Sequence, residues 1–77
     1  MKARLHHHGD RYSVIFDGKP LVERSRDPEC DAARALAAMG ITGRLTLCDG
    51  QTGIPRTIID VERAARLTVE APSGKLL

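Results

Sequence analysis

The residues best suited to chemistry are scattered along the chain, beginning with three consecutive histidines at positions 6 to 8. Imidazole nitrogens bind metals and act as general bases. Consecutive residues on a regular element point in different directions, so these histidines make a poor metal site. We predict that residues 1–9 form a flexible N-terminal tail, in which the histidines are exposed and badly placed for preorganised catalysis.

Two cysteines, Cys30 and Cys48, offer a second kind of chemistry. Cys30 falls in the first turn of a predicted helix, where the helix dipole can activate a thiol. Neither cysteine stands at C-x-x-C spacing or at metal-ligand spacing from a histidine. The alternatives are a reactive Cys30 or a zinc site that joins both thiols to the tail histidines. We interpret both as ordinary buried or half-buried thiols and expect neither a metal nor a cofactor.

Catalysis requires a nucleophile with a base in reach and a group that orients the base. The hydroxyl residues have no obvious base beside them. Carboxylate pairs occur only at predicted helix starts, Glu29 with Asp31 and Asp60 with Glu62, where helix capping explains them. A chain this short also lacks material for a deep pocket. We therefore predict a protein that is not an enzyme and has no catalytic residues.

Arginine is the most prominent charged residue type, and its planar guanidinium suits phosphate and carboxylate. Strict alternation along four predicted strands places one group of arginines on the sheet face that a helix leaves open. This face is our candidate contact surface for an anion or nucleic acid. The alternative is a solvated sheet face whose arginines pair with Glu23 and threonines. The candidate residues are Arg11, Arg24, Arg44 and Arg56.

Two Asp-Gly sequences, Asp17-Gly18 and Asp49-Gly50, resemble ligand loops at first sight. Each loop supplies one carboxylate, whereas a calcium loop needs oxygen ligands from several alternating positions. Each is flanked by apolar residues and followed by a proline at the start of a predicted strand. Hairpin turns explain these residues without a ligand, because glycine accepts the positive φ that tight turns require.

Four short strands are predicted around these turns, over residues 11–17, 20–26, 44–48 and 54–60. Apolar and polar residues alternate in them, which is typical of half-buried strands. The register of the first hairpin stays open. A two-residue loop places Val14 opposite Leu21, whereas a four-residue loop places Phe16 opposite Leu21.

The clearest local signal is the segment "RDPECDAARALAAMG", which predicts a helix over about residues 28–39. Asp27 is a suitable N-cap, Pro28 suits the first helical position, and Gly40 supplies a left-handed end. The segment "DVERAARL" predicts a short second helix over about residues 61–67, capped by Asp60. The alternative is one helical turn followed by a fifth strand at 67–70.

These elements predict an α+β fold of two layers in the order ββαββ(α), with the main helix on one face of a mostly antiparallel, four-stranded sheet. We expect a single small domain over residues 10–71 and a flexible C-terminal tail over residues 72–77.

Composition narrows the function classes. The chain has 77 residues, 12 basic and 10 acidic, for a net charge of +2, which is far from a strongly basic nucleic-acid binder. Its aromatic residues are one Tyr and one Phe, too few for a platform that stacks bases. No apolar run is long enough to span a membrane, and the basic first residues are followed by no apolar stretch, so we do not expect a secretory signal. We expect a cytoplasmic protein, and the excess of arginine over lysine suggests a bacterial source.

Two functions from different classes remain. The first is a small, non-catalytic interaction domain that binds a protein partner or itself, because a small sheet leaves two open edges and a small core benefits from a second subunit. The alternative is weak, sequence-independent nucleic-acid binding through the arginine-bearing face.

Overall fold

The structure is a computed structural model that describes residues 1–66. It contains β1 (Lys2–His8), β2 (Arg11–Phe16), β3 (Lys19–Ser25), α1 (Pro28–Ala38), β4 (Arg44–Asp49) and β5 (Pro55–Asp60). The chain is helical again over residues 61–66, which form the short second helix. The strand considered at 67–70 and the tail expected at 72–77 lie outside the described residues.

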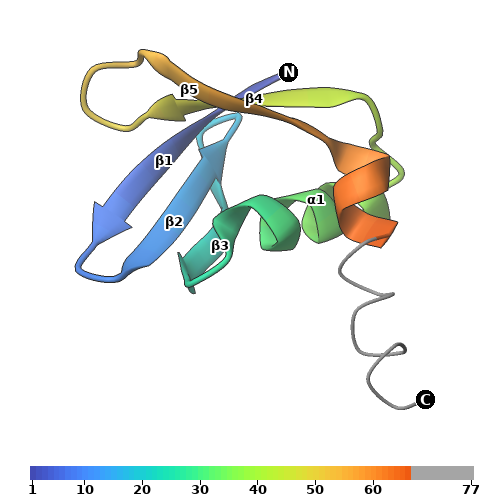
Figure 1. Ribbon diagram of the computed structural model, residues 1–77, viewed down its shortest axis with the longest axis horizontal. Helices are drawn as coiled ribbons and strands as arrows, with labels where there is room; N and C mark the ends of the chain where they lie inside the picture. Colours follow the sequence, from blue (N-terminus) through green and yellow to red (C-terminus); the bar gives the residue numbers. More distant parts are fainter. Residues whose placement is uncertain (67–77) are drawn as a thin grey trace.

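All five strands form one mixed sheet in the order β3-β2-β1-β4-β5, with α1 and the short helix beside it (Figure 1). The β1–β4 pair is parallel, and the other three pairs are antiparallel. The predicted α+β fold is therefore confirmed, with one main helix and one short helix. The predicted number of strands is wrong, because the sheet has five strands rather than four.

The additional strand is β1, which lies at the centre of the sheet. Its residues fall within the segment 1–9, for which we predicted a flexible tail. It pairs with β2 along residues Ala3 to His8 and with β4 along residues Lys2 to Leu5. Ala3 is only 3% exposed because strands cover it on both sides and the core covers its helix-facing side. Strand β1 pairs with β2 across the Gly9-Asp10 turn and with β4 far along the chain, and three consecutive histidines obscure its alternation.

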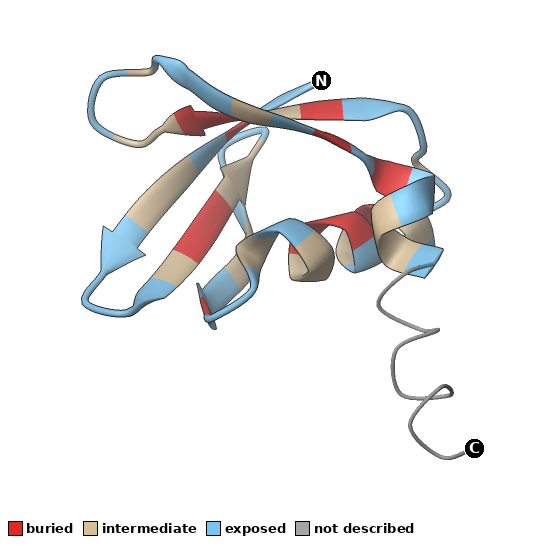
Figure 2. Cartoon of the chain, in the orientation of Figure 1, coloured by how far each residue is buried: buried red, intermediate tan, exposed pale blue. Residues whose placement is uncertain are grey.

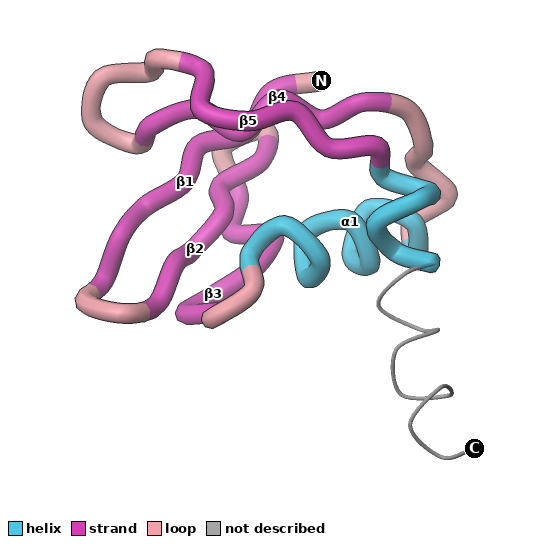
Figure 3. The backbone as a smooth tube through the Cα atoms, viewed as in Figure 1, coloured by secondary structure: helices cyan, strands magenta, loops and turns pink. Residues whose placement is uncertain are grey.

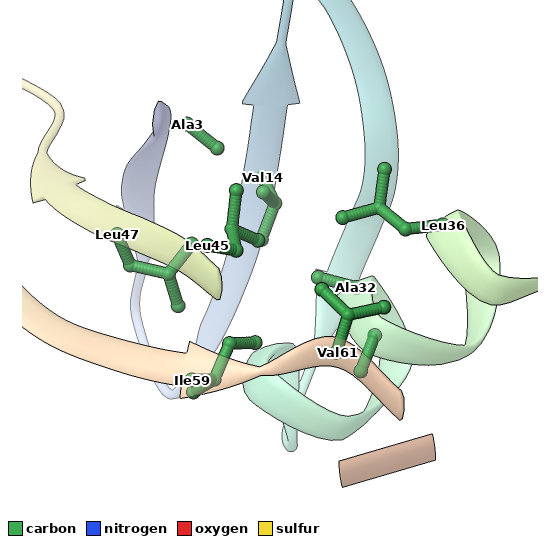
Figure 4. Close-up of a cluster of buried hydrophobic side chains, with 9 residues drawn as sticks. Ala3, Val14, Ala32, Leu36, Leu45, Leu47, Ile59 and Val61 are labelled. Carbon is green, nitrogen blue, oxygen red and sulfur yellow. The ribbon is translucent and has the colours of Figure 1, made fainter. Parts of the chain in front are cut away.

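The core lies between the sheet and the helices (Figures 2 and 4). Val14, Leu45 and Leu47 point from the sheet, and Leu36 and Val61 reach them from the helical side; all five are 0% exposed. The alanine-lined face of α1, which includes the fully buried residues Ala32 and Ala33, packs toward the sheet. Small side chains allow the helix to approach closely, which fits the predicted use of this face.

The start of α1 is held by Ser25 and not by the side chain of Asp27. Pro28 begins the helix, but the carboxylate of Asp27 makes no capping hydrogen bond. Ser25 supplies the polar contacts instead, because its Oγ accepts from the Asp27 N–H at 2.9 Å and also contacts the Asp31 carboxylate.

The predicted left-handed end at Gly40 is confirmed by its φ of 76°. The Gly40 N–H donates to the Ala37 carbonyl at 2.9 Å, and the Ile41 N–H donates to the Leu36 carbonyl at 2.9 Å. This pair of bonds is a Schellman motif, which satisfies carbonyls that the helix end leaves open.

Bulges interrupt the alternation in both edge strands. The β2–β3 turn has two residues, since Phe16 lies opposite Lys19, but Val14 lies opposite Val22 rather than Leu21. A two-residue loop is one of the two predicted alternatives. Leu21 is then an extra residue in β3 and shifts the register by one. A second extra residue falls near Arg24, whose φ is 50°. A bulge lets two residues of one strand oppose one residue of the next and redirects side chains.

Candidate interaction surfaces

The sheet face away from α1 carries a row of basic residues along its central strand. Ala3 and Leu5 contribute to the core on the helix side. Alternate residues of β1 therefore point to the opposite, open face. Arg11 joins them because it lies directly opposite His8. We call this row the basic stripe: Lys2, Arg4, His6, His8 and Arg11.

The four arginines predicted as anion contacts do not form one group. Arg11 lies at one end of the open face, and Arg44 lies beyond the other end of the stripe, opposite Asp60. Arg24 lies in the bulge of β3, where its N–H donates to Ser13 Oγ at 3.1 Å and its carbonyl accepts from Arg11 Nη1 at 3.4 Å. Arg56, the fourth of these arginines, lies in a bulge of β5.

Arg56 is redirected by an irregularity in β5. Leu47 pairs with Thr57 and Cys48 pairs with Pro55, so Arg56 is the extra residue. It lines a hollow together with Leu5 and Thr57, on the helix side of the sheet. Simple alternation cannot place this side chain, because a bulge breaks the period of two.

Sequence analysis missed the stripe residues of β1. The signal was nevertheless present, because Lys2 and Arg4 alternate with Ala3 and Leu5 in the first five residues. The consecutive histidines obscured the pattern. In the strand their side chains separate, with His6 and His8 on the open face and His7 on the helix side, stacked on Tyr12 with ring centroids 4.7 Å apart.

The Asp49-Gly50 turn is held by its own hydrogen bonds. Asp49 Oδ1 accepts from the N–H groups of Gln51 and Thr52, each at 2.8 Å. These two bonds lower the pKa of the Asp49 carboxyl, and the bond from Thr52 has the larger effect. Arg56 lowers this pKa further by a smaller electrostatic contribution. The turn therefore has a structural explanation that needs no bound cation.

A hollow separates the two hairpins at one end of the sheet. The β1–β4 pairing ends at Leu5 and Asp49, and beyond it the β1–β2 and β4–β5 hairpins diverge (Figures 1 and 3). The hollow has a volume of about 480 Å³ and is lined by His7, Tyr12 and Arg56, among others. A neighbouring hollow of about 320 Å³ reaches the acidic first turn of α1. Charges of both signs line these spaces, and residues 1–66 contain no cluster of three metal-ligating side chains.

The free edge of β5 exposes large apolar side chains. Ile58 on β5 is 63% exposed, and Ile54, just before the strand, is 62% exposed. Within residues 1–66, β5 pairs only with β4 and ends the order of strands. An edge strand that exposes apolar side chains is a template for pairing with another chain.

The cysteines lie in separate elements, with Cys48 buried in β4 and Cys30 half-buried in α1, and they form no disulfide.

Comparison with protein-family models, with curated proteins and with solved structures found no match. Among the helices of residues 1–66, none combines the length and apolar character needed to cross a membrane.

Proposed function

We propose that this chain is a small, non-catalytic interaction domain of the bacterial cytoplasm that associates with a second copy of itself through the free edge of β5. The observation that carries the proposal is the exposure of Ile58, at 63%, in the middle of an edge strand. A β-branched residue in this position supplies both an apolar contact and an extended backbone.

The hydrogen-bonding pattern between β4 and β5 supports pairing at the free edge of β5. The Val61 N–H donates to the Gly43 carbonyl at 2.8 Å, and Thr46 lies opposite Ile58. In an antiparallel ladder only every second residue directs its N–H and C=O toward the neighbouring strand. Residues 57 and 59 therefore point toward β4, whereas Ile58 directs its backbone groups outward.

An antiparallel pairing of two β5 strands about a two-fold axis would be centred on Ile58. Each Ile58 N–H would donate to the Ile58 carbonyl of the second copy, and the two exposed side chains would cover one another. Such an interface is self-complementary and closes after two subunits. It would also add core to a domain whose small size limits its stability.

The opposite edge of the sheet is less suited to this pairing. Strand β3 has two register shifts against β2, contains Pro20, and places Arg24 at a positive φ. Bulges and proline are features that disfavour edge-to-edge pairing. In β5 the bulge lies at Arg56, which leaves a regular run toward Asp60.

Sedimentation velocity over a range of concentrations tests the proposal. We expect the wild-type protein to pass from monomer to dimer as its concentration rises, and Ile58→Lys to remain monomeric because it places charge at the centre of the interface. Met39→Lys is the matched control, since Met39 is 56% exposed but lies at the end of α1. A wild-type monomer at the highest concentration, or equal dimerisation of Ile58→Lys, would contradict the proposal.

A further inference from the structure

The basic stripe forms a row along the central strand of the open face. Lys2, Arg4, His6 and His8 follow one another at two-residue intervals. Each interval in a strand spans about 7 Å, so the row is roughly 20 Å long. Strands flank β1 on both sides at Lys2 and Arg4, whereas His6 and His8 lie beyond the end of the β4 pairing and are held by β2.

The residues beside the stripe leave its charge uncovered. Thr46 lies opposite Lys2, Cys48 and Ile15 lie opposite Arg4, and Ser13 lies opposite His6. All of these neighbours are uncharged. Acidic residues lie beside the stripe and not within it: Asp17 near Lys2, Asp60 opposite Arg44, Asp10 at 3.8 Å from Arg11, and Asp49, which lines a hollow with His6 and His8.

Three residues of the stripe carry a permanent positive charge and remain available to a ligand: Lys2, Arg4 and Arg11. Lys2 and Arg4 are exposed and form none of the ion pairs found within residues 1–66. Arg4 Nη1 donates to the Gly50 carbonyl at 3.3 Å, which positions the guanidinium without neutralising it. The contact of Arg11 with Asp10 is exposed, and exposed pairs of this kind are weak.

From this arrangement we infer that the basic stripe binds the phosphodiester backbone of nucleic acid without reading its sequence. A row of cations separated by small uncharged residues is complementary to a row of phosphates. Phosphate contacts supply affinity and position but carry no sequence information.

The absence of base reading follows from the placement of the aromatic rings. Both Tyr12 and Phe16 lie in register with Val14 on the helix side of β2. Neither ring reaches the open face, so bases have no aromatic platform of this kind there.

Fluorescence anisotropy with labelled duplex DNA of two unrelated sequences, measured against salt concentration, tests this inference. Each phosphate contact contributes about −0.9 to the slope of log affinity against log salt, so Lys2, Arg4 and Arg11 predict a slope of about −2.7. The two sequences should bind equally.

A matched pair of double variants localises the contact. Lys2→Gln with Arg4→Gln should make the slope shallower by about 1.8. The control, Arg34→Gln with Arg63→Gln, removes the same charge from exposed positions in the two helices and should leave the slope unchanged. Circular dichroism checks folding, and Lys2→Gln alone, with an expected change of about 0.9, replaces the double variant if that one fails to fold.

Three results would overturn the inference. The first is undetectable binding at about 50 mM salt. The second is an equal loss in the control variant, which would show that only net charge matters. The third is a preference for phosphatidylserine vesicles over the duplex, which would assign the stripe to an anionic membrane surface.

Discussion

The N–H of Gly50 donates to the carbonyl of Leu5 at 3.0 Å and so joins the β4–β5 turn to the central strand. A Cβ atom at Gly50 would stand 2.7 Å from that carbonyl oxygen and 2.8 Å from His6 Nδ1. The two segments are far apart in the sequence, and their close approach requires a residue without a side chain.

Substitution of Gly50 should therefore destabilise the fold. We expect Gly50→Val to lower the free energy of unfolding by about 1–3 kcal/mol, because the side chain forces β1 and the turn apart. Urea denaturation measures the change. Gln51→Ala, at the next and exposed position, should stay within about 0.5 kcal/mol of the wild type. Equal stability of the two variants would contradict the close contact between Gly50 and Leu5.

Ionisation of Asp49 should stabilise the turn in a defined pH range. Its folded-state pKa lies below the ordinary 3.8, so the contribution is fully present above that value and is lost as the pH falls through the lower, folded-state pKa. Asp49→Asn keeps an acceptor oxygen but not the charge, so at neutral pH it should be less stable than the wild type by this contribution. Thermal unfolding of wild type and Asp49→Asn between about pH 6 and pH 2 should show only the wild type losing this contribution. Parallel pH profiles would refute the assignment.

Ser25, rather than Asp27, should control the start of α1. Ser25 is 8% exposed, and Ser25→Ala removes the acceptor of the Asp27 N–H and a partner of Asp31. We expect a cost of about 1–3 kcal/mol, typical of a buried polar group left without its partner. Asp27→Ala should cost less than about 0.5 kcal/mol, because that carboxylate makes no capping bond. If chemical denaturation showed a larger loss of stability for Asp27→Ala than for Ser25→Ala, Asp27 would be the cap.

Ala3 distinguishes a central strand from a flexible tail. Ala3→Asp introduces a carboxylate where the residue is 3% exposed and should unfold a domain of marginal stability. The exposed neighbour change, Lys2→Gln, should leave the far-UV circular dichroism spectrum and the thermal midpoint unchanged. A folded Ala3→Asp variant of wild-type stability would mean that β1 is dispensable.

Local chemistry explains which parts of the fold the sequence predicts. The helix starts and stops depend on residues within one turn: Pro28 begins α1, Gly40 ends it, and Asp60 Oδ1 accepts from the Arg63 N–H at 2.9 Å as predicted for a cap. The Asp17-Gly18 turn likewise follows from the adjacent residues, whose φ angles of 54° and 77° suit a tight hairpin.

Long-range pairing explains the rest. Strand β1 has few apolar residues, and no local pattern reveals its parallel pairing with the distant β4. The grouping of Arg11, Arg24, Arg44 and Arg56 rested on unbroken alternation, and bulges near Arg24 and Arg56 interrupt that period. Charged residues near the chain start, Lys2 and Arg4, gain a shared face only once β1 is recognised.

The most direct measurement of the central claim is amide hydrogen exchange at Ile58 as a function of protein concentration. In a monomer this N–H points outward from the edge of β5 and should exchange rapidly, whereas the Ile59 N–H points toward β4 at every concentration. Self-association through β5 predicts that protection of the Ile58 amide rises with concentration while that of Ile59 changes much less. Rapid exchange at Ile58 under conditions in which the protein is dimeric would contradict the proposed interface.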